Sequence, residues 1–431
     1  MLLTRRQVLI GLAACSAGAW PADRPRDRWR AEASRLTRQT VRTFWDGSAL
    51  LFRGPVASAE TVPSDGLQDR GYVVWPVVVC FRALAEAERS EPGRWERALR
   101  ATFLSMERYY DAEAGAYNAW LTFPGNNDKY FDDNGWAVLG LLAAFEATRD
   151  RRFLERATEV FDRFLIGGID RSGKPGGVRW GTDPDKPGTC DRNACSTEAV
   201  ALAALGLAGQ GHRRPVCLAL ARGLLDWLEE TLVDRDGLVR DGLFAPNWAI
   251  NPTKWTYNTG NLIRAWVDWS ALSGDRTGLE RAERLAEAAC DRTKPLYDSV
   301  VADPSRRHWF DSTFFAEHLA DGLLRLERAV GGSARRAEVE RHAEFALRFL
   351  KDTDGLYWRN LRPWRIAEGP HRAWRRATGA AQELDPDEAE RSKAPEALEL
   401  PVGRRPLVKT LLGNAGMANL LWHLARTDGR N

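Results

Sequence analysis

The stretch KYFDDNGWAVLGLLAAFEATRD (Lys129–Asp150), followed at once by RRFLERATEVFDRFL (Arg151–Leu165), contains the unit from which the fold is built. The first segment is apolar on nearly every side, and a helix of that kind must be buried on nearly every side. The second segment has apolar residues at the i, i+3, i+4, i+7 spacing of a helix with one wet face. Together they predict a helical hairpin with an inner and an outer helix.

Segments of these two kinds alternate along the chain from about residue 27 onward, and strand-like alternation is scarce. The segments with one wet face cover residues 28–45, 94–110, 151–165, 218–232, 278–292 and 335–350. The segments that are apolar on most sides cover residues 72–87, 132–147, 196–209, 258–272, 312–326 and 409–425. Six outer and six inner helices without a strict repeat unit predict an all-α fold, the (α/α)6 barrel, in preference to a helical solenoid.

The N-terminal segment, residues 1–25, reads as a leader rather than as part of the fold. It contains the twin arginine Arg5 and Arg6 and then a short apolar run that ends in LAAC at Cys15. This pattern is typical of an export signal, and the run is too short to span a bilayer. Cys15 is either the lipidated first residue of a lipoprotein or an incidental cysteine in an ordinary cleaved signal. We expect an exported protein, periplasmic or at the cell surface, with a lipid anchor at Cys15 as one of the two alternatives.

The remaining chain, residues 27–429, is expected to form a single (α/α)6 domain. One polar segment within it, residues 366–404, is rich in Arg, Glu and Pro. It is longer than the loops of most compact domains, and such long segments are either functional or disordered. We interpret it as either a cover over the barrel mouth or a surface insert.

The composition limits the class of partner. The chain carries 62 Lys and Arg against 59 Asp and Glu, with both signs mixed along it. That balance argues against nucleic acid, because such proteins usually concentrate basic charge on one face. The 18 tryptophans suit stacking against sugar faces, although indoles also fill large helical cores. The six histidines are scattered without metal-ligand spacing, so no metal is expected.

The cysteines beyond the leader lie mostly on apolar helices and number five, an odd count that is typical of buried thiols. A short bridge between Cys190 and Cys195 in an oxidising compartment is the alternative.

The polar stretches directly before the inner helices carry the candidate chemistry. In an alternating barrel all inner helices run the same way, so their N-termini gather at one rim. Helix N-termini also present the positive ends of their dipoles, which favour ionised carboxylates. The stretches that should converge there are NNDKYFDDNGW, GTCDRNACST, NPTKWTYNTGN and RRHWFDST.

Two adjacent aspartates, Asp132 and Asp133, stand at this rim. One of them can act as an N-cap, which is the ordinary role of an aspartate before a helix, but a cap needs only one carboxylate. Two close carboxylates can hold different pKa values, so that one is ionised and the other protonated. Cleavage of a glycosidic bond requires that division, because one group attacks or activates water while the other protonates the departing oxygen.

The helix with the aspartate pair resembles the corresponding helix of glycoside hydrolase family 76, the endo-α-1,6-mannanases, and the likeness continues in linear order. It covers roughly residues 30–330, and five motifs in order are far more specific than any one of them. The other motifs are GGVRWGTD (Gly176–Asp183), similar to the family's Gly-Gly-x-x-Trp, RNACST (Arg192–Thr197), similar to its Lys-Asn-Ala, DGLVRDGL (Asp236–Leu243), similar to its Gly-Leu-x-x-Asp-Gly, and WTYNTGNLI (Trp255–Ile263), similar to its Tyr-Asn-x-Gly.

The resemblance implies an (α/α)6 barrel that cuts α-mannosidic linkages, with α-1,6 linkages in mannan-like glycans as the expected target, by a retaining mechanism. Carried over, Asp132 is the nucleophile and Asp133 the general acid/base, without metal or organic cofactor. Where many members carry a tryptophan doublet after the pair, this chain has NGW with Trp136 alone. That departure bears on the identity of the substrate more than on the catalytic chemistry.

Other residues of these stretches are candidates for holding an oligo- or polysaccharide. Each also has an ordinary alternative, namely core packing for an indole, backbone bonding for an amide, and a cap or solvated charge for an acid. The candidates are Trp136, Trp180 and Trp255 for stacking, Asn193, Tyr257 and Asn258 for hydrogen bonds to hydroxyls, and Asp241 and Asp311 at inner-helix entries.

Two other function classes compete with a glycosidase. A lipoprotein that binds or transglycosylates glycan is the first, although a mere binder needs no paired carboxylates. A sugar epimerase on the same barrel is the second. Such enzymes use histidine acid/base pairs, and here the histidines avoid the motif stretches except His308 beside Trp309.

Overall fold

The computed structural model describes residues 25–56, 72–121, 128–172 and 175–426. Arg5, Arg6 and Cys15 lie outside these residues. The chain divides into two compact units. The terminal unit comprises Met1–Ser105, Pro295–Glu317 and Ala337–Asn431, and the central unit comprises Met106–Lys294 and His318–Arg336. The single domain predicted over residues 27–429 stays a prediction.

Both units are mainly helical, as predicted. The helices of the terminal unit are α2 (Pro25–Phe44), α3 (Val74–Ser90), α4 (Glu96–Met106), the first turn of α11 (Thr313–Val330), most of α12 (Ala334–Phe349), α13 (Glu368–Thr378), α14 (Pro395–Leu398) and α15 (Leu411–Ala425). Its short strands are β1 (Trp45–Asp46), paired with β2 (Leu51–Phe52), and β3 (Pro55–Val56), paired with β9 (Lys409–Thr410).

The central unit contains three consecutive helical hairpins and the rest of α11. The hairpins are α5 (Phe131–Thr148) with α6 (Arg151–Arg163), α7 (Ala194–Gly209) with α8 (Arg214–Leu232), and α9 (Thr256–Ser273) with α10 (Thr277–Cys290). Its strands are β4 (Tyr110–Asp111) with β5 (Ala116–Tyr117), and the antiparallel sheet β6 (Arg192–Asn193), β7 (Gly242–Phe244) and β8 (Ala249–Asn251).

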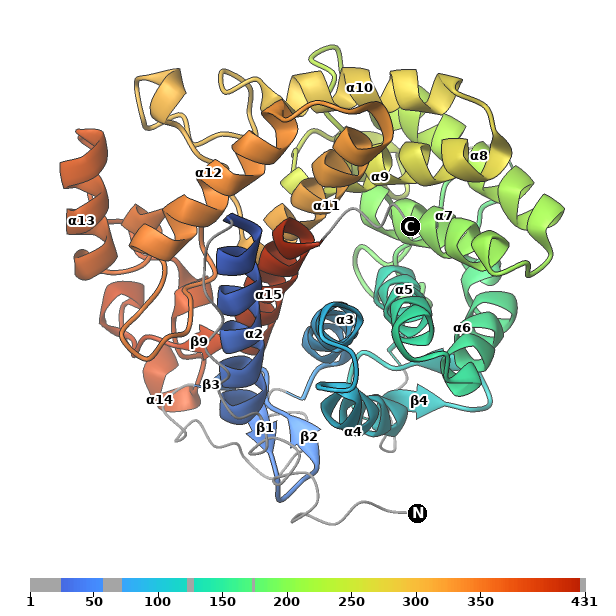
Figure 1. Cartoon of the computed structure of the whole chain (residues 1–431), viewed down its shortest axis with the longest axis horizontal. Helices are drawn as coiled ribbons and strands as arrows, with labels where there is room; N and C mark the ends of the chain where they lie inside the picture. Colours follow the sequence, from blue (N-terminus) through green and yellow to red (C-terminus); the bar gives the residue numbers. More distant parts are fainter. Residues whose placement is uncertain (1–24, 57–71, 122–127, 173–174, 427–431) are drawn as a thin grey trace. The chain divides into compact units, whose positions relative to one another are not determined.

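The division into inner and outer helices follows the hydrophobic pattern. Helix α5 packs on α7 and α7 on α9, while α6, α8 and α10 each cover the preceding helix from outside (Figure 1). Helix α6 buries only a stripe that includes Phe153, Val160 and Phe161. Its N-cap is Asp150, whose Oδ1 accepts the backbone N–H of Arg152 at 3.2 Å. The sequence thus encodes both the wet face and the helix start.

Small residues let the inner helices approach closely. A Cβ added to Gly135 of α5 would lie 2.6 Å from the Cβ of Ala199 on α7. A Cβ on Gly206 of α7 would likewise lie 2.6 Å from Leu142 of α5. The two helices therefore meet with little space between their backbones, as the run of glycine and alanine predicts.

The inner helices of the terminal unit hold a buried polar cluster. Arg82 of α3 donates to Glu317 Oε1 at 3.0 Å, and His423 Nε2 of α15 lies 3.1 Å from Glu317 Oε2. All three side chains are buried. The cluster ties α15 to α3 and to the first turn of α11, because leaving one member without the others would strand a buried charge.

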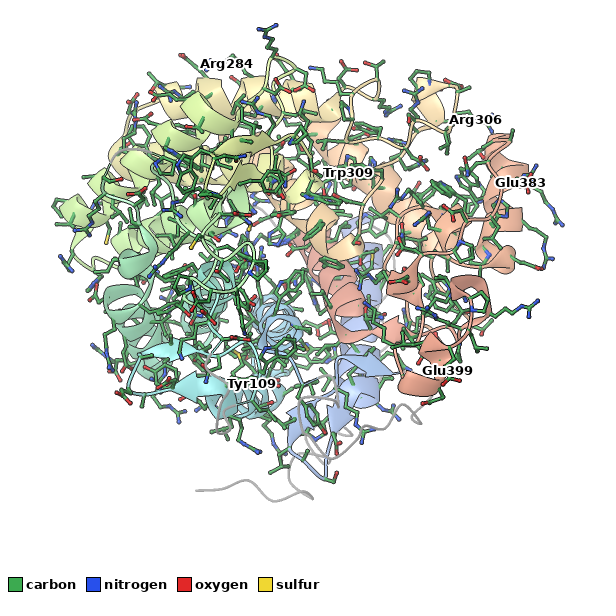
Figure 2. The ribbon with its side chains drawn as sticks, turned by 180° about the vertical axis from the view of Figure 1, so that it is seen from behind. Tyr109, Arg284, Arg306, Trp309, Glu383 and Glu399 are labelled. Atoms are coloured by element: carbon green, nitrogen blue, oxygen red, sulfur yellow. The ribbon has the colours of Figure 1, made fainter. Side chains whose placement is uncertain are left out.

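His308 is packed into the terminal unit. Its ring stacks on Phe345 with centroids 3.9 Å apart, and His342 stacks on Trp309 at 3.6 Å. The backbone N–H of Trp309 donates to His342 Nε2 at 3.0 Å. Trp309 is fully buried, whereas Arg306, three residues earlier, is exposed (Figure 2). These histidines therefore have structural partners in this unit.

The polar segment 366–404 contains α13, α14 and two short 3-10 helices. The side chains of Glu383 and Glu399 are exposed (Figure 2). Those of Trp374 and Glu390 are buried. Glu390 Oε1 accepts the backbone N–H of Asn360 at 2.8 Å. The segment is therefore fastened to the terminal unit by internal bonds rather than by apolar packing alone.

Glu390→Gln is expected to stabilise the protein at alkaline pH. Burial raises the pKa of Glu390 from 4.5 to about 7, so the folded state loses stability as the pH rises through about 7. The neutral amide removes the cost of burying an ionised carboxylate, which is about 3 kcal/mol of folding stability once Glu390 is ionised. Thermal unfolding should show a higher melting temperature for the variant at pH 8 and little difference at pH 5. The matched control is Glu383→Gln at an exposed carboxyl of the same segment, and a pH-independent gain in Glu390→Gln would contradict the assignment.

Candidate active site

The aspartate pair occupies the first turn of α5, and Asp132 has hydrogen-bond donors around both oxygens. Its Oδ1 accepts the backbone N–H of Asp133 at 2.9 Å. Its Oδ2 accepts Trp180 Nε1–H at 3.1 Å and the thiol of Cys195 at 3.4 Å. Burial raises the pKa of Asp132, and these three bonds to the ionised form limit the rise.

Asp133 differs from Asp132 in the hydrogen bonds that its carboxyl accepts. Within the described residues, no donor or cation lies within bonding distance of its carboxyl. Burial raises the pKa of Asp133 well above its usual range, and the negative charge of Asp132 raises it further. Both side chains retain solvent-accessible surface. The geometry therefore favours an ionised Asp132 beside a protonated Asp133, which is the division that glycosidic cleavage requires.

The glycine-rich motif places Trp180 against the pair. Tyr130, directly before α5, forms a β-bridge with Gly181, and the N–H of Phe131 donates to the carbonyl of Trp180 at 2.9 Å. The rings of Tyr130 and Trp180 pack with centroids 4.7 Å apart. Because this backbone pairing fixes the segment, the Trp180 indole reaches Asp132 from a position 48 residues along the chain.

A short sheet places Cys195. Residues Arg192 and Asn193 pair with Leu243 and Gly242 of β7, directly before α7 begins. A side chain at Gly242 would collide with the Arg192 carbonyl, since its Cβ would lie 2.5 Å away. The sheet thus orients the first turn of α7, from which Cys195 reaches Asp132. Cys190 and Cys195 are free thiols, so the alternative of a bridge between them is wrong.

Asp241 is the third carboxyl of the cluster, after Asp132 and Asp133. Its Oδ1 accepts Asn258 Nδ2–H at 3.2 Å and the Tyr257 hydroxyl at 3.3 Å, and its Oδ2 accepts Asn251 Nδ2–H at 3.0 Å. Burial raises its pKa, and these donors oppose the rise. Burial raises the pKa of the Cys195 thiol, and the negative charges of Asp132 and Asp241 both add to the rise, so both acids lie near this thiol.

Glu198, one turn after Cys195 on α7, is fully buried beneath this cluster. Its Oε2 accepts Asn261 Nδ2–H at 3.1 Å. Burial raises the pKa of Glu198 well above its usual range, and the charge of Asp241 adds to the effect. A neutral carboxyl on an otherwise apolar helix is therefore part of the environment of the candidate site.

Of the remaining predicted site residues, some belong to the central unit and one belongs to the terminal unit. Trp136 lies one turn beyond the pair on α5, where its ring packs on His318 of α11 at 4.5 Å. Trp255 is the N-cap residue of α9 and is half-buried. Asp311 belongs to the terminal unit, where it is buried and its carbonyl accepts the N–H of Leu361 at 2.9 Å. In the central unit, Trp136 is linked to Tyr257 through His318, Trp255 hydrogen-bonds Asp241, and Asn193 lies directly before α7.

Sequence reasoning missed four residues of the central cluster: Cys195, Glu198, Asn251 and His318. Cys195 and Glu198 lie in the segment that carries the Lys-Asn-Ala-like motif, but their types alone read as a buried thiol and a helix carboxyl. Among the described residues, no group of three or more His, Cys, Asp or Glu side chains is arranged to hold a metal ion. The described helices include none that is long and apolar enough to cross a bilayer.

Comparison with known proteins places the chain in a family. The model of glycosyl hydrolase family 76 matches residues 26–354, and the chain belongs to that family. It is therefore a glycoside hydrolase by family. The segment 366–404 lies outside the matched residues.

Individual relatives cover nearly the whole chain. The meiotically up-regulated gene 191 protein of Schizosaccharomyces pombe (strain 972 / ATCC 24843) is 30% identical over 93% of this chain and 92% of its own length. A family 76 α-mannanase of Bacteroides thetaiotaomicron is 18% identical, covers 94% of this chain and 96% of its own, and superposes with a TM-score of 0.69.

A third relative is an inactive variant of the α-1,6-mannanase of Salegentibacter sp. HEL1_6, in which two consecutive aspartates are changed to asparagine. It was solved in complex with α-1,6-mannotriose, is 18% identical, covers 92% of this chain and 99% of its own, and has a TM-score of 0.65. These superpositions confirm the predicted all-α class and the (α/α)6 barrel.

Proposed function

We propose that this protein is a retaining glycoside hydrolase that cleaves α-1,6-mannosidic linkages in mannan-like glycans through Asp132 and Asp133. The observation that carries the proposal is the asymmetry of the pair, in which Asp132 accepts three hydrogen bonds and Asp133 accepts none among the described residues. The inactive mannanase with two consecutive aspartates replaced, bound to α-1,6-mannotriose, supports both the pair and the substrate class.

In the proposed reaction the ionised Asp132 attacks the anomeric carbon while Asp133 gives its proton to the departing glycosidic oxygen. Asp133, now a carboxylate, then takes a proton from water, which hydrolyses the glycosyl–Asp132 ester and restores both groups. Asp241, held by Tyr257, Asn258 and Asn251, is the proposed acceptor for sugar hydroxyls.

The competing classes receive less support from the contacts. An epimerase needs two histidines as acid and base, and among the described residues of the central unit only His318 contacts a predicted site residue. A pure binding protein has no use for a carboxyl held protonated beside an ionised one. Hydrolysis is favoured over both on these grounds, and transfer to a sugar acceptor would use the same two aspartates.

The direct experiment incubates purified protein with α-1,6-mannan and measures new reducing ends. We expect their release, with the α-anomer formed first when products are followed by NMR, because two displacements at one carbon retain its configuration. A product that appears first as the β-anomer would contradict the assignment of Asp132 as nucleophile. No release from linear α-1,6-mannan would reject the substrate.

The thiol of Cys195 is expected to set the acidic limb of the pH profile. Cys195→Ala removes a donor from the ionised Asp132, which raises the pKa of Asp132, so the acidic limb of kcat/KM should move to higher pH by about half a unit. Cys195→Ser keeps a donor of similar shape and should return the limb to the wild-type position or below. The measurement is kcat/KM on α-1,6-mannan between pH 3 and 8. Coincident profiles for the two variants would show that the thiol contact does not tune Asp132.

We also propose that the protein is exported, to the periplasm or the cell surface. Support comes from the twin arginine at Arg5 and Arg6 and the apolar run that ends at Cys15. Membrane attachment is tested by labelling cells with a palmitate analogue and comparing wild type with Cys15→Ala. Label that is lost in the variant supports a lipid anchor, whereas a shortened, unlabelled mature chain supports an ordinary cleaved signal. A full-length chain confined to the cytoplasm would reject export.

A further inference from the structure

The hairpin formed by β7 and β8, Gly242–Asn251, exposes large apolar side chains beside the candidate site. Phe244, Trp248 and Ile250 are 44%, 37% and 42% exposed. Single exposed apolar residues are common on protein surfaces and require no explanation. Phe244 pairs with Ala249 and Ile250 pairs with Leu243, so the side chains of Phe244 and Ile250 lie on opposite faces of the hairpin, and Trp248 stands in the turn between the strands.

Trp248 is held in an unusual backbone conformation. Its φ is +58°, in the left-handed region that bulky side chains rarely adopt. Its N–H donates to the carbonyl of Phe244 at 2.7 Å, which closes the turn around it. Glycine would fit this position without strain, so a tryptophan here indicates that the indole has a use.

Arg192 fixes one face of the indole. Its guanidinium carbon lies 5.2 Å from the ring centroid of Trp248. The same guanidinium lies 3.5 Å from Asp170 and donates to the carbonyl of Cys190. Because Arg192 is itself held by two other groups, the Trp248 ring is oriented before any ligand arrives, and preorganised rings bind with a smaller entropic penalty.

The hairpin is continuous with the cluster around the aspartate pair. Arg192 pairs with Leu243 in the sheet and lies three residues before Cys195, a separation of at most about 10 Å, and Cys195 contacts Asp132. At the base of the hairpin, Asn251 holds Asp241. A polymer lying over Asp132 and Asp133 can therefore reach Trp248 through neighbouring units of the same chain.

We propose that Trp248 is a distal sugar subsite, on which a hexopyranosyl ring of the mannan chain stacks several units from the bond that is cut. The apolar C–H face of a pyranose suits the exposed face of an indole, whose other face carries Arg192. This inference rests on the proposed function, since it takes its ligand from the same substrate. It adds a requirement for chain length that the aspartate pair alone does not impose.

The experiment compares wild type with Trp248→Ala and Trp248→Gly on α-1,6-mannotriose and on polymeric α-1,6-mannan. We expect KM for the polymer to rise about tenfold in both variants, which is the effect of losing about one stacked ring. The loss in kcat/KM should be at least severalfold larger on the polymer than on the trisaccharide. Trp248→Gly should melt no lower than wild type, because glycine removes the backbone strain, and this distinguishes a binding role from a structural one.

The matched control is Ile250→Ala, which removes an equally exposed apolar side chain from the same hairpin without removing a planar ring. Its KM on the polymer should stay within about twofold of wild type. Binding is also followed without cleavage, by retardation in native gels that contain α-1,6-mannan. Retardation that is lost in both Trp248 variants but kept in Ile250→Ala supports the subsite even if no reducing ends form, in which case only the proposed function fails.

Two results would overturn the subsite. One is equal losses on trisaccharide and polymer, with unchanged retardation in the gel. The other is a change of oligomeric state in Trp248→Ala without any length-dependent effect, which would identify the hairpin as an interface between copies of the chain.

Discussion

Asp132→Asn and Asp133→Asn are each expected to lower kcat/KM on α-1,6-mannan by about 10³-fold or more while the protein stays folded. The asparagine at position 132 cannot attack the anomeric carbon. The asparagine at position 133 cannot give a proton to the departing oxygen. Reducing-end release over time, normalised to folded protein, measures both losses.

The two variants should differ in ways that separate the roles. With an aryl mannoside whose leaving group needs no proton, Asp133→Asn should form the glycosyl–enzyme but hydrolyse it slowly, and azide should accelerate turnover by replacing water. Asp132→Asn should gain nothing from either change. A variant that keeps full activity at either position would reject catalysis by the pair.

Stability supplies an independent control for the same variants. Because burial and the charge of Asp132 raise the pKa of Asp133 in the folded state, its neutral form is favoured and stability falls as the pH rises through that pKa. Asp133→Asn replaces the carboxyl by a neutral isostere, so its melting temperature at neutral pH should equal or exceed that of wild type. A large drop in melting temperature would mean that lost activity reflects lost fold.

Gly260→Ala is expected to destabilise the protein by about 3 kcal/mol or more. Gly260 lies where α9 crosses α11, and a Cβ there would stand 2.4 Å from Cα and 2.5 Å from N of Leu319. These are backbone atoms, so relief requires a shift of helix α11 rather than rotation of a side chain. The glycine opposite, Gly322, is equally tight, since its Cβ would lie 2.3 Å from the Gly260 carbonyl.

Gly223→Ala is the matched control for this prediction. Gly223 lies inside α8, and a Cβ there meets no atom within 4 Å. The same chemical change should therefore stabilise the protein, by roughly 0.5–1 kcal/mol, because alanine restricts the unfolded chain and favours the helix. Denaturant unfolding of both variants gives the two free energies of unfolding. Shifts of the same sign and similar size would contradict the close backbone approach.

The helical part of the fold could be predicted because its signal lies in consecutive residues. The segment predicted as inner helix from Asp132 to Ala147 is observed as α5 from Phe131 to Thr148. The sheet of β6, β7 and β8 could not be found in this way, since strands of two or three residues are too short to show a period. Yet this sheet fixes the start of α7, whose first turn contacts Asp132 through Cys195, and the turn between β7 and β8 carries Trp248.

The sequence predicted which residues belong to the candidate site better than it predicted the contacts between them. The argument that inner-helix N-termini share a rim placed Asp132, Asp241 and Tyr257 together, and the structure groups all three in the central unit. Cys195 was predicted only to be a buried thiol, because the sequence does not show its contact with the carboxylate of Asp132, 63 residues earlier. His318, far along the chain, required the tertiary structure itself.

The packing of helix α15 has a consequence for how the chain is made. This helix, Leu411–Ala425, packs on α2 and α3, with Trp422 Nε1 donating to Thr37 at 3.0 Å and Asn419 to the Val79 carbonyl at 3.1 Å. The faces of α2 and α3 that α15 covers therefore stay uncovered until a helix far along the chain is made, since Thr37 and Trp422 are 385 residues apart. An intermediate that lacks α15 exposes this apolar surface, and such surface makes folding intermediates prone to aggregation.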